Sequence, residues 1–113
     1  MKAEILPVAL SLRIDWSEMD LFGHVNNVSF FKYIQASRVN YWEQSGISKL
    51  FAEEKQGPIL ASVNCNFIQP LFYPGNILIK AQIEFMKTTS FGLHHQIFNN
   101  KQELAAEEVS KSW

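Results

Sequence analysis

The feature that most limits the fold of this chain is a change in its hydrophobic period after residue 45. Over residues 27–45, most apolar side chains fall within one broad arc of a helical wheel, which predicts an amphipathic helix of about five turns. Over residues 77–86, two sets of side chains alternate without interruption, which predicts a strand. A chain with one such helix and several strands buries the helix on one face of a sheet.

The remaining elements follow from the same patterns and from turn residues. Period-two alternation predicts further strands over residues 8–14, 61–67 and 90–98. The stretches YPGN at 73–76 and NNK at 99–101 are typical of turns, and Gly46 is expected to end the helix. The segment after the second turn alternates poorly, because Glu107 and Glu108 are adjacent. The layout predicts the α+β class, with an antiparallel sheet curled around one long helix.

Length and composition exclude several classes of protein. The 113 residues fit a single domain over 1–113, and no repeat or linker divides them. Ten Lys and Arg against eleven Asp and Glu give a net charge of -1, which argues against a nucleic-acid partner. No apolar run approaches the ~18 residues of a membrane span. Cys65 is the single cysteine, so we expect no disulfide framework, and the simplest compartment is the cytoplasm.

The loop before the helix, SEMDLFGHVNNVSF at 17–30, has the residues best suited to chemistry. The carboxylate of Asp20 either accepts backbone hydrogen bonds as a loop residue or acts as a base or nucleophile. Asn26 and Asn27 lie where the helix begins, where a side chain can cap the helix and a main-chain N–H lacks an intrahelical partner. Gly23 is expected to supply an unusual backbone angle.

Other candidate residues give weaker signals. His94 and His95 are adjacent on a predicted strand, so their side chains point to opposite faces and do not form a joint metal site. Cys65 alternates with core residues and is expected to be a buried structural thiol. Ser90 lacks the Gly-x-Ser-x-Gly setting of a serine hydrolase. We therefore expect no metal. Arg38 falls inside the apolar arc of the helix and is expected to snorkel or to pair with a carboxylate.

Three stretches in order along the chain resemble one known family. A motif of the form D-x-x-G-H-V-N-N is matched here by Asp20, Gly23, His24, Val25, Asn26 and Asn27. Together with VNCNFIQPLFYPGN at 63–76 and TTSFGLHHQIFN at 88–99, it resembles the 4-hydroxybenzoyl-CoA thioesterase-like family of hotdog-fold acyl-CoA thioesterases. The chain departs from that pattern at Asp15, Glu18 and Asn76.

The resemblance implies a fold, an activity and a set of site residues. The fold would be the hotdog, and the activity would be hydrolysis of an acyl-CoA thioester to free acid and CoA. Asp20 would be the base or nucleophile, the main-chain N–H of Asn27 would polarise the carbonyl, and His24 would assist. Gly23, Val25 and Asn26 would bind substrate.

The resemblance also implies partners and leaves alternatives open. No cofactor is expected beyond the coenzyme A of the substrate, and a homodimer or homotetramer would form the site between subunits. Lys80, Lys87 and Arg38 are candidates to hold the nucleotide of coenzyme A. The alternatives are a thioesterase acting on acyl-carrier-protein substrates, or a non-catalytic hotdog module that binds acyl-CoA or a protein. A hotdog hydratase is less favoured, because that family uses a differently arranged Asp and His pair.

Overall fold

The computed structural model describes residues 8–45, 60–87 and 90–112 of the chain. Its elements are β1 (Val8–Arg13), the short 3-10 helix η1 (Trp16–Glu18), α1 (Asn27–Ser45), β2 (Leu60–Phe67), β3 (Asn76–Met86), β4 (Phe91–Phe98) and β5 (Leu104–Ser112). The predicted helix is confirmed over its whole range, and the ends of the four predicted strands are confirmed to within one residue. The predicted helix end at Gly46 lies outside the described residues.

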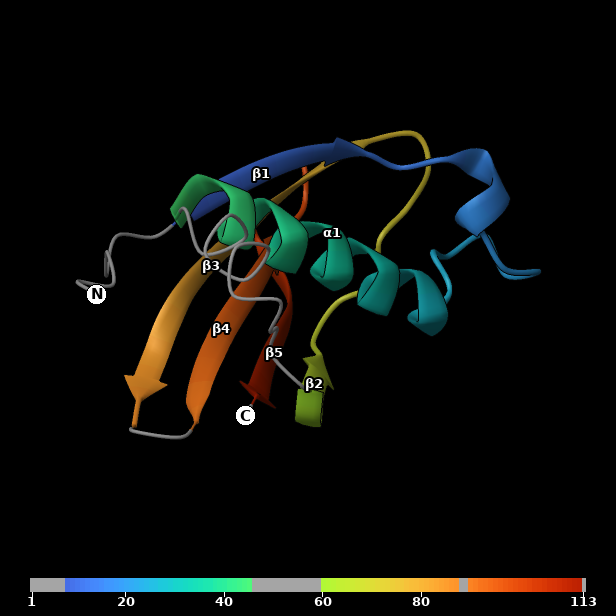
Figure 1. Ribbon diagram of the computed structural model, residues 1–113. Coiled ribbons are helices and arrows are strands. Elements are labelled where there is room, and N and C mark those ends of the chain that lie inside the picture. Colours follow the sequence, from blue (N-terminus) through green and yellow to red (C-terminus); the bar gives the residue numbers. More distant parts are fainter. Residues whose placement is uncertain (1–7, 46–59, 88–89, 113) are drawn as a thin grey trace.

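The five strands form one antiparallel sheet with the order β1-β3-β4-β5-β2. The helix α1 lies against one face of this sheet, as Figure 1 shows. The register places Ile79 of β3 opposite both Leu10 and Ile97, so apolar side chains form rows across neighbouring strands. This is the predicted α+β arrangement of a curved sheet and one long helix.

The hydrophobic core forms between α1 and the inner face of the sheet. The helix buries Phe30, Tyr33, Ile34 and Tyr41, and the sheet contributes Ile77, Ile79, Ala81, Leu93 and Ile97. Each large side chain removed from water in this way stabilises the fold by about 1.5–3 kcal/mol. Phe31 falls in the same apolar arc of the helical wheel, but it is 43% exposed. No helix in the described ranges is long and apolar enough to cross a membrane.

The last strand is more regular than its sequence predicts. β5 has nine residues and pairs with β4 on one side and with β2 on the other. Its side chains at 106, 108, 110 and 112 are all buried, which is the period of two expected for a strand. The sequence hides this pattern because three of these four inward residues, Glu108, Ser110 and Ser112, are polar.

An ionic cluster lies in the core beneath the second half of α1. Arg38 donates from Nη2 to Oε2 of Glu108 at 3.5 Å, which confirms the expected pairing of Arg38 with a carboxylate. Nδ1 of His95 on β4 lies 3.3 Å from the same oxygen, and the side chains of His95 and Glu108 are fully buried. The adjacent His94 faces the other way and lies 3.2 Å from Glu107, as expected for neighbours on a strand. Cys65, opposite Glu108 on β2, is only partly buried, and both burial and the nearby Glu108 raise the pKa of its thiol.

Candidate active site

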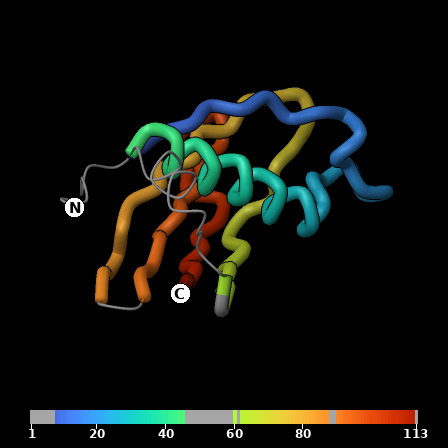
Figure 2. The backbone as a smooth tube through the Cα atoms, viewed as in Figure 1, coloured from blue at the N-terminus to red at the C-terminus, as the bar shows by residue number. Residues whose placement is uncertain are grey.

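The segment between β1 and α1 projects beyond the start of the helix, as the tube in Figure 2 shows. Asp15 begins η1, since its Oδ1 accepts a hydrogen bond from the Ser17 N–H at 3.1 Å. The following loop is closed by a bridge between Met19 and Val25. The predicted backbone angle of Gly23 is confirmed: its φ is +81°, in the left-handed region that favours glycine.

The carboxylate of Asp20 has one oxygen engaged and one oxygen open. Its Oδ1 accepts hydrogen bonds from the N–H groups of Phe22 at 2.8 Å and His24 at 3.0 Å. Its Oδ2 has no hydrogen-bond partner among the residues at 8–45, 60–87 and 90–112. The two interpretations of Asp20 are therefore compatible: one oxygen holds the loop, and the other is available to react.

The start of α1 separates the two roles proposed for its asparagines. Asn26 caps the helix, because its Oδ1 accepts a hydrogen bond from the Ser29 N–H at 2.8 Å. Its Nδ2 and main-chain N–H both donate to the carbonyl of Glu18, at 3.0 and 2.9 Å. The main-chain N–H of Asn27 has no acceptor within the part of the chain that the structure describes. This unpaired N–H and the positive end of the helix dipole therefore both favour negative charge at the start of α1.

Asp20 and Asn27 line the same hollow, which has a volume of about 260 Å³. It is lined by Asp20, His24, Val25, Asn27, Phe30, Phe67, Ile68, Gln69 and Pro70. Gly23 and Asn26 do not line it, so they shape the loop and the helix start from outside. The wall from Phe67 to Pro70 was not predicted, since it comes from a segment some forty residues away. Its one signal in the sequence is the apolar pair Phe67 and Ile68 at the end of a strand.

His24 and Val25 are fixed by the segment that follows β2. The main-chain N–H of Val25 donates to the carbonyl of Leu71 at 2.8 Å, and the side chain of Val25 is buried. The ring of His24 meets the ring of Phe72 edge to face, with 5.0 Å between the centroids. Apolar packing thus holds the imidazole beside the hollow.

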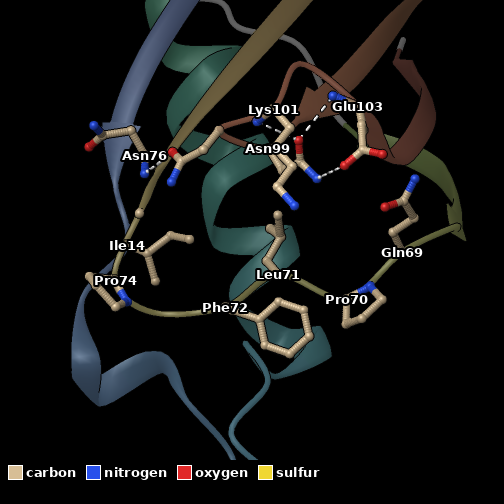
Figure 3. A pocket seen from close by; sticks show the side chains of 12 residues that line it. Ile14, Gln69, Pro70, Leu71, Phe72, Pro74, Asn76, Asn99, Lys101 and Glu103 are labelled. Atoms are coloured by element: carbon tan, nitrogen blue, oxygen red, sulfur yellow. Dashed lines mark hydrogen bonds between the residues drawn. The ribbon is translucent and has the colours of Figure 1, made fainter.

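A second hollow of about 300 Å³ shares Gln69 and Pro70 with the first; Figure 3 shows its lining. Much of its polar lining is engaged in holding a hairpin together. Oδ1 of Asn99 accepts hydrogen bonds from the N–H groups of Lys101 and Glu103, both at 2.9 Å, and its Nδ2 donates to Glu103 Oε1 at 3.1 Å. The first hollow is the better candidate site, because its polar groups at Asp20 and Asn27 are open.

A buried carboxylate, that of Glu18, lies behind the loop. It accepts hydrogen bonds from Lys32 Nζ at 2.8 Å, Tyr33 OH at 2.7 Å and the Asp15 N–H at 2.8 Å. Burial alone would raise the pKa of Glu18, but the hydrogen bonds outweigh it and hold that pKa below its ordinary value. Burial and the same carboxylate raise the pKa of Tyr33, and the hydrogen bond to Glu18 raises the pKa of Lys32. Glu18 is therefore an anion at neutral pH.

The residues expected to hold the nucleotide of coenzyme A can also be located. Arg38 is paired with Glu108 in the core, whereas Lys80 and Lys87 are exposed over the rings of Phe98 and Phe85. Within the described ranges, no group of three or more His, Cys, Asp or Glu side chains has the arrangement of a metal site.

The chain is similar to known proteins in sequence and in structure. Residues 14–111 match the model of the thioesterase-like superfamily, so the chain belongs to that superfamily, and its fold is the hotdog fold. A curated relative is the uncharacterized protein YsmA of Bacillus subtilis (strain 168), which is 28% identical over 83 residues. The match covers 73% of this chain and 54% of that relative, so the chain spans about half of the relative's length.

Two solved structures illustrate the likeness in three dimensions. The DHNA-CoA thioesterase from Staphylococcus aureus is 26% identical, with a TM-score of 0.78 over 94% of this chain and 72% of that chain. A mutant 4-hydroxybenzoyl CoA thioesterase complexed with 4-hydroxybenzoyl CoA is 18% identical, with a TM-score of 0.84 over 94% of this chain and 81% of that chain. The second likeness concerns the fold alone.

Proposed function

We propose that this chain hydrolyses an acyl-CoA thioester to a free acid and CoA. The observation that carries the proposal is that one hollow is lined by two residues with complementary unpaired groups. They are Asp20, whose Oδ2 accepts no hydrogen bond within the described residues, and Asn27, whose main-chain N–H donates none there. Thioester hydrolysis needs a nucleophile at the carbonyl carbon, which is either a carboxylate or a water molecule activated by a base. It also needs a hydrogen-bond donor on the carbonyl oxygen. The membership of the chain in the thioesterase-like superfamily supports the same reaction.

In the proposed mechanism, the thioester carbonyl oxygen accepts a hydrogen bond from the Asn27 N–H at the start of α1. The Asp20 carboxylate then either attacks the carbonyl carbon or removes a proton from a water molecule that does so. Negative charge develops on the carbonyl oxygen, where the helix dipole and the amide stabilise it. A donor arranged in this way contributes about 2.7–4 kcal/mol to the transition state. The C–S bond breaks and CoA leaves as the thiolate, which takes up a proton; on the first route water then hydrolyses the acyl anhydride on Asp20 to the free acid. His24, beside the hollow, assists in placing the thioester or the water.

The superfamily and the names of its neighbours support a CoA thioester as the substrate. The DHNA-CoA thioesterase and the 4-hydroxybenzoyl CoA thioesterase both act, by name, on CoA thioesters. The hollow adds the rings of Phe30 and Phe67 next to Asp20, 5.2 Å apart and edge to face, which suits an apolar acyl group.

We also propose that the active unit is a homodimer, with a homotetramer as the larger alternative. Among the described residues β2 is an edge strand that pairs with β5 alone, so its other edge has backbone groups without a partner there. Exposed apolar side chains lie on or beside this strand: Val63 and Phe67 on β2, Ile68 directly after it, and Phe31, whose ring is 6.1 Å from that of Phe67. A second copy on this edge would cover the open side of the hollow. Light scattering at micromolar concentration tests this, and a monomer would contradict it.

The experiment for the activity is a free-thiol assay over a panel of acyl-CoA substrates, with Asp20→Asn and Asp20→Ala beside the unaltered protein. We expect both variants to lower kcat by about 100-fold or more while the assembly is unchanged. Glu84→Gln is the matched control, since Glu84 is an exposed carboxylate on β3 and does not line the hollow. Turnover that is the same in Asp20→Asn and in the unaltered protein would overturn the assignment.

The same assay separates the alternatives. Faster release of acid from acyl-carrier protein than from matched acyl-CoA would favour the carrier-protein thioesterase. Tight binding of acyl-CoA with no thiol released would favour a non-catalytic binding module.

A further inference from the structure

We propose that Glu18 is a positioning residue, whose side chain and carbonyl together set the distance between the Asp20 carboxylate and the Asn27 N–H. This inference rests on the proposed function, because it assigns Asp20 and Asn27 as the reacting and polarising groups. Glu18 itself does not line the hollow, so its effect passes through those two residues.

The side chain of Glu18 fastens the loop to the flank of the helix. Its two oxygens accept hydrogen bonds from Lys32 and Tyr33, which lie fourteen and fifteen residues further along the chain, on the second turn of α1. The same carboxylate closes η1, because its Oε1 also accepts from the Asp15 N–H. The side chain is 6% exposed, so water competes little for these bonds.

The carbonyl of Glu18 fastens the loop to the first turn of the helix. It accepts two hydrogen bonds from the helix cap Asn26, one from the main chain and one from the side chain. Asn26 directly precedes Asn27, and Asp20 is two residues after Glu18. Because consecutive Cα atoms are about 3.8 Å apart, the Cα atoms of Asp20 and Asn27 each lie within about 8 Å of the Cα atom of a fastened residue. A shift of Glu18 therefore moves Asp20 and Asn27 relative to one another.

The chemistry of Glu18 favours a geometric role over a purely stabilising one. A buried carboxylate with charged partners is often no more stable than apolar side chains of the same size. Its hydrogen bonds are directional, however, and they fix the angle at which η1 meets α1. Catalysis is sensitive to such angles, since a displacement of about 1 Å at a reacting group can lower the rate about 100-fold.

The test is a graded series in which Glu18→Gln keeps an acceptor for Tyr33 and the Asp15 N–H, and Glu18→Ala keeps none. We expect kcat to fall about 10-fold in Glu18→Gln and about 100-fold in Glu18→Ala, with KM changed less than about threefold. If Glu18→Ala does not fold, Tyr33→Phe takes its place, because it removes only the buried hydroxyl donor. Equal kcat in all variants would overturn the proposal.

A double-mutant cycle with Asp20→Asn distinguishes positioning from general loss of structure. Positioning predicts that Glu18→Gln has almost no further effect when Asp20 is already Asn, whereas an independent effect would multiply and would overturn the proposal. Asp15→Asn is the matched control, since Asp15 caps η1 without contacting α1 through its side chain. We expect this control to lower kcat less than Glu18→Gln does.

The outcomes separate this inference from the proposed function. If Asp20→Asn leaves turnover unchanged, the proposed function is wrong, and the inference that rests on it is overturned with it. If Asp20→Asn abolishes turnover but the Glu18 series does not change kcat, only the positioning role is wrong.

Amide hydrogen exchange gives a reading without catalysis: Glu18→Gln should speed exchange at Phe22 and His24 and leave β3 and β4 unchanged. Unchanged exchange at Phe22 and His24 would contradict the proposed positioning role of Glu18.

Discussion

Glu18 and Glu108 are both buried carboxylates that contact α1, one beside its first turns and the other beneath its second half. Glu18 accepts three hydrogen bonds of 2.7–2.8 Å, from a lysine, a tyrosine and a main-chain N–H. Glu108 has longer contacts, 3.5 Å to Arg38 and 3.3 Å to His95. Around Glu108, within the described residues, buried polar atoms also lack hydrogen-bond partners: Arg38 Nε, both ring nitrogens of His95, Glu108 Oε1 and Ser110 Oγ.

The difference shows that two buried carboxylates can constrain a fold in different ways. Short and complete hydrogen bonds fix Glu18 in one position, so it can define the shape of the neighbouring loop. The looser cluster around Glu108 holds Arg38 chiefly by charge, and so it keeps α1 over β4 and β5 without fixing an angle. We therefore expect changes at Glu18 to alter activity and changes at Glu108 to alter stability.

The largest effect on stability is expected from Arg38→Met. It removes the cation beside Glu108 and leaves a buried charge without its main partner, so the free energy of unfolding should fall by about 3–5 kcal/mol. Urea denaturation measures this change. The double variant Arg38→Met with Glu108→Leu should recover much of the loss, and kcat of the folded fraction should be nearly unchanged. A large fall in kcat would show that the two clusters are not separable.

The next effect is that of Tyr33→Phe. The variant deletes a buried hydroxyl that donates to the charged Glu18, so the free energy of unfolding should fall by about 1.5–3 kcal/mol. Unlike Arg38→Met, it should also lower kcat. Denaturation and turnover measured on the same preparation test this. A loss of stability with full activity would show that Glu18, like Glu108, supports stability and not activity.

A smaller effect is expected from acid. The pKa of Glu18 is lower in the folded chain than its ordinary value of 4.5, so its contribution to stability is complete above that pH. The contribution is lost as the pH falls from about 4.5 through the lowered pKa. Glu18→Gln should therefore show a shallower decline in melting temperature between pH 5 and pH 3, as measured by circular dichroism. Identical declines would show that the hydrogen-bond partners of Glu18 do not stabilise its ionised form in the folded chain.

The smallest effect is expected from Lys32→Met. The side chain of Lys32 is 68% exposed, and water and salt weaken its attraction to Glu18. We expect the melting temperature to change within experimental error and kcat to change less than in Tyr33→Phe. If Lys32→Met lowers kcat more than Tyr33→Phe, then charge rather than the buried hydroxyl is the main support of Glu18.

The sequence predicted the elements well because their signals are local. The ranges of α1 and the strands follow from periods of 3.6 and two, which need no knowledge of distant residues. The convergence of Asp20 and Asn27 was also accessible, since only six residues separate them. The wall at Phe67–Pro70 and the fastening of Glu18 by Lys32 and Tyr33 were not, because they depend on how the chain folds back on itself.

β5 shows a second limit of sequence patterns. Its inward residues are mostly polar, so hydrophobicity gives no indication of which face is buried. Only the contact of Glu108 with Arg38 and His95 explains why a carboxylate faces the core. The one hint of this buried acid in the sequence is Arg38, which falls inside the apolar arc of the helix.

The strand order also has a consequence for synthesis on the ribosome. β2 pairs only with β5, so residues 60–67 have no partner strand in this sheet until residues 104–112 have been translated. During that interval Val63 and Phe67 are exposed on a strand segment without its partner, which is a common starting point for aggregation. Slowing elongation between β2 and β5 should therefore lower the soluble yield, whereas slowing it before residue 60 should not.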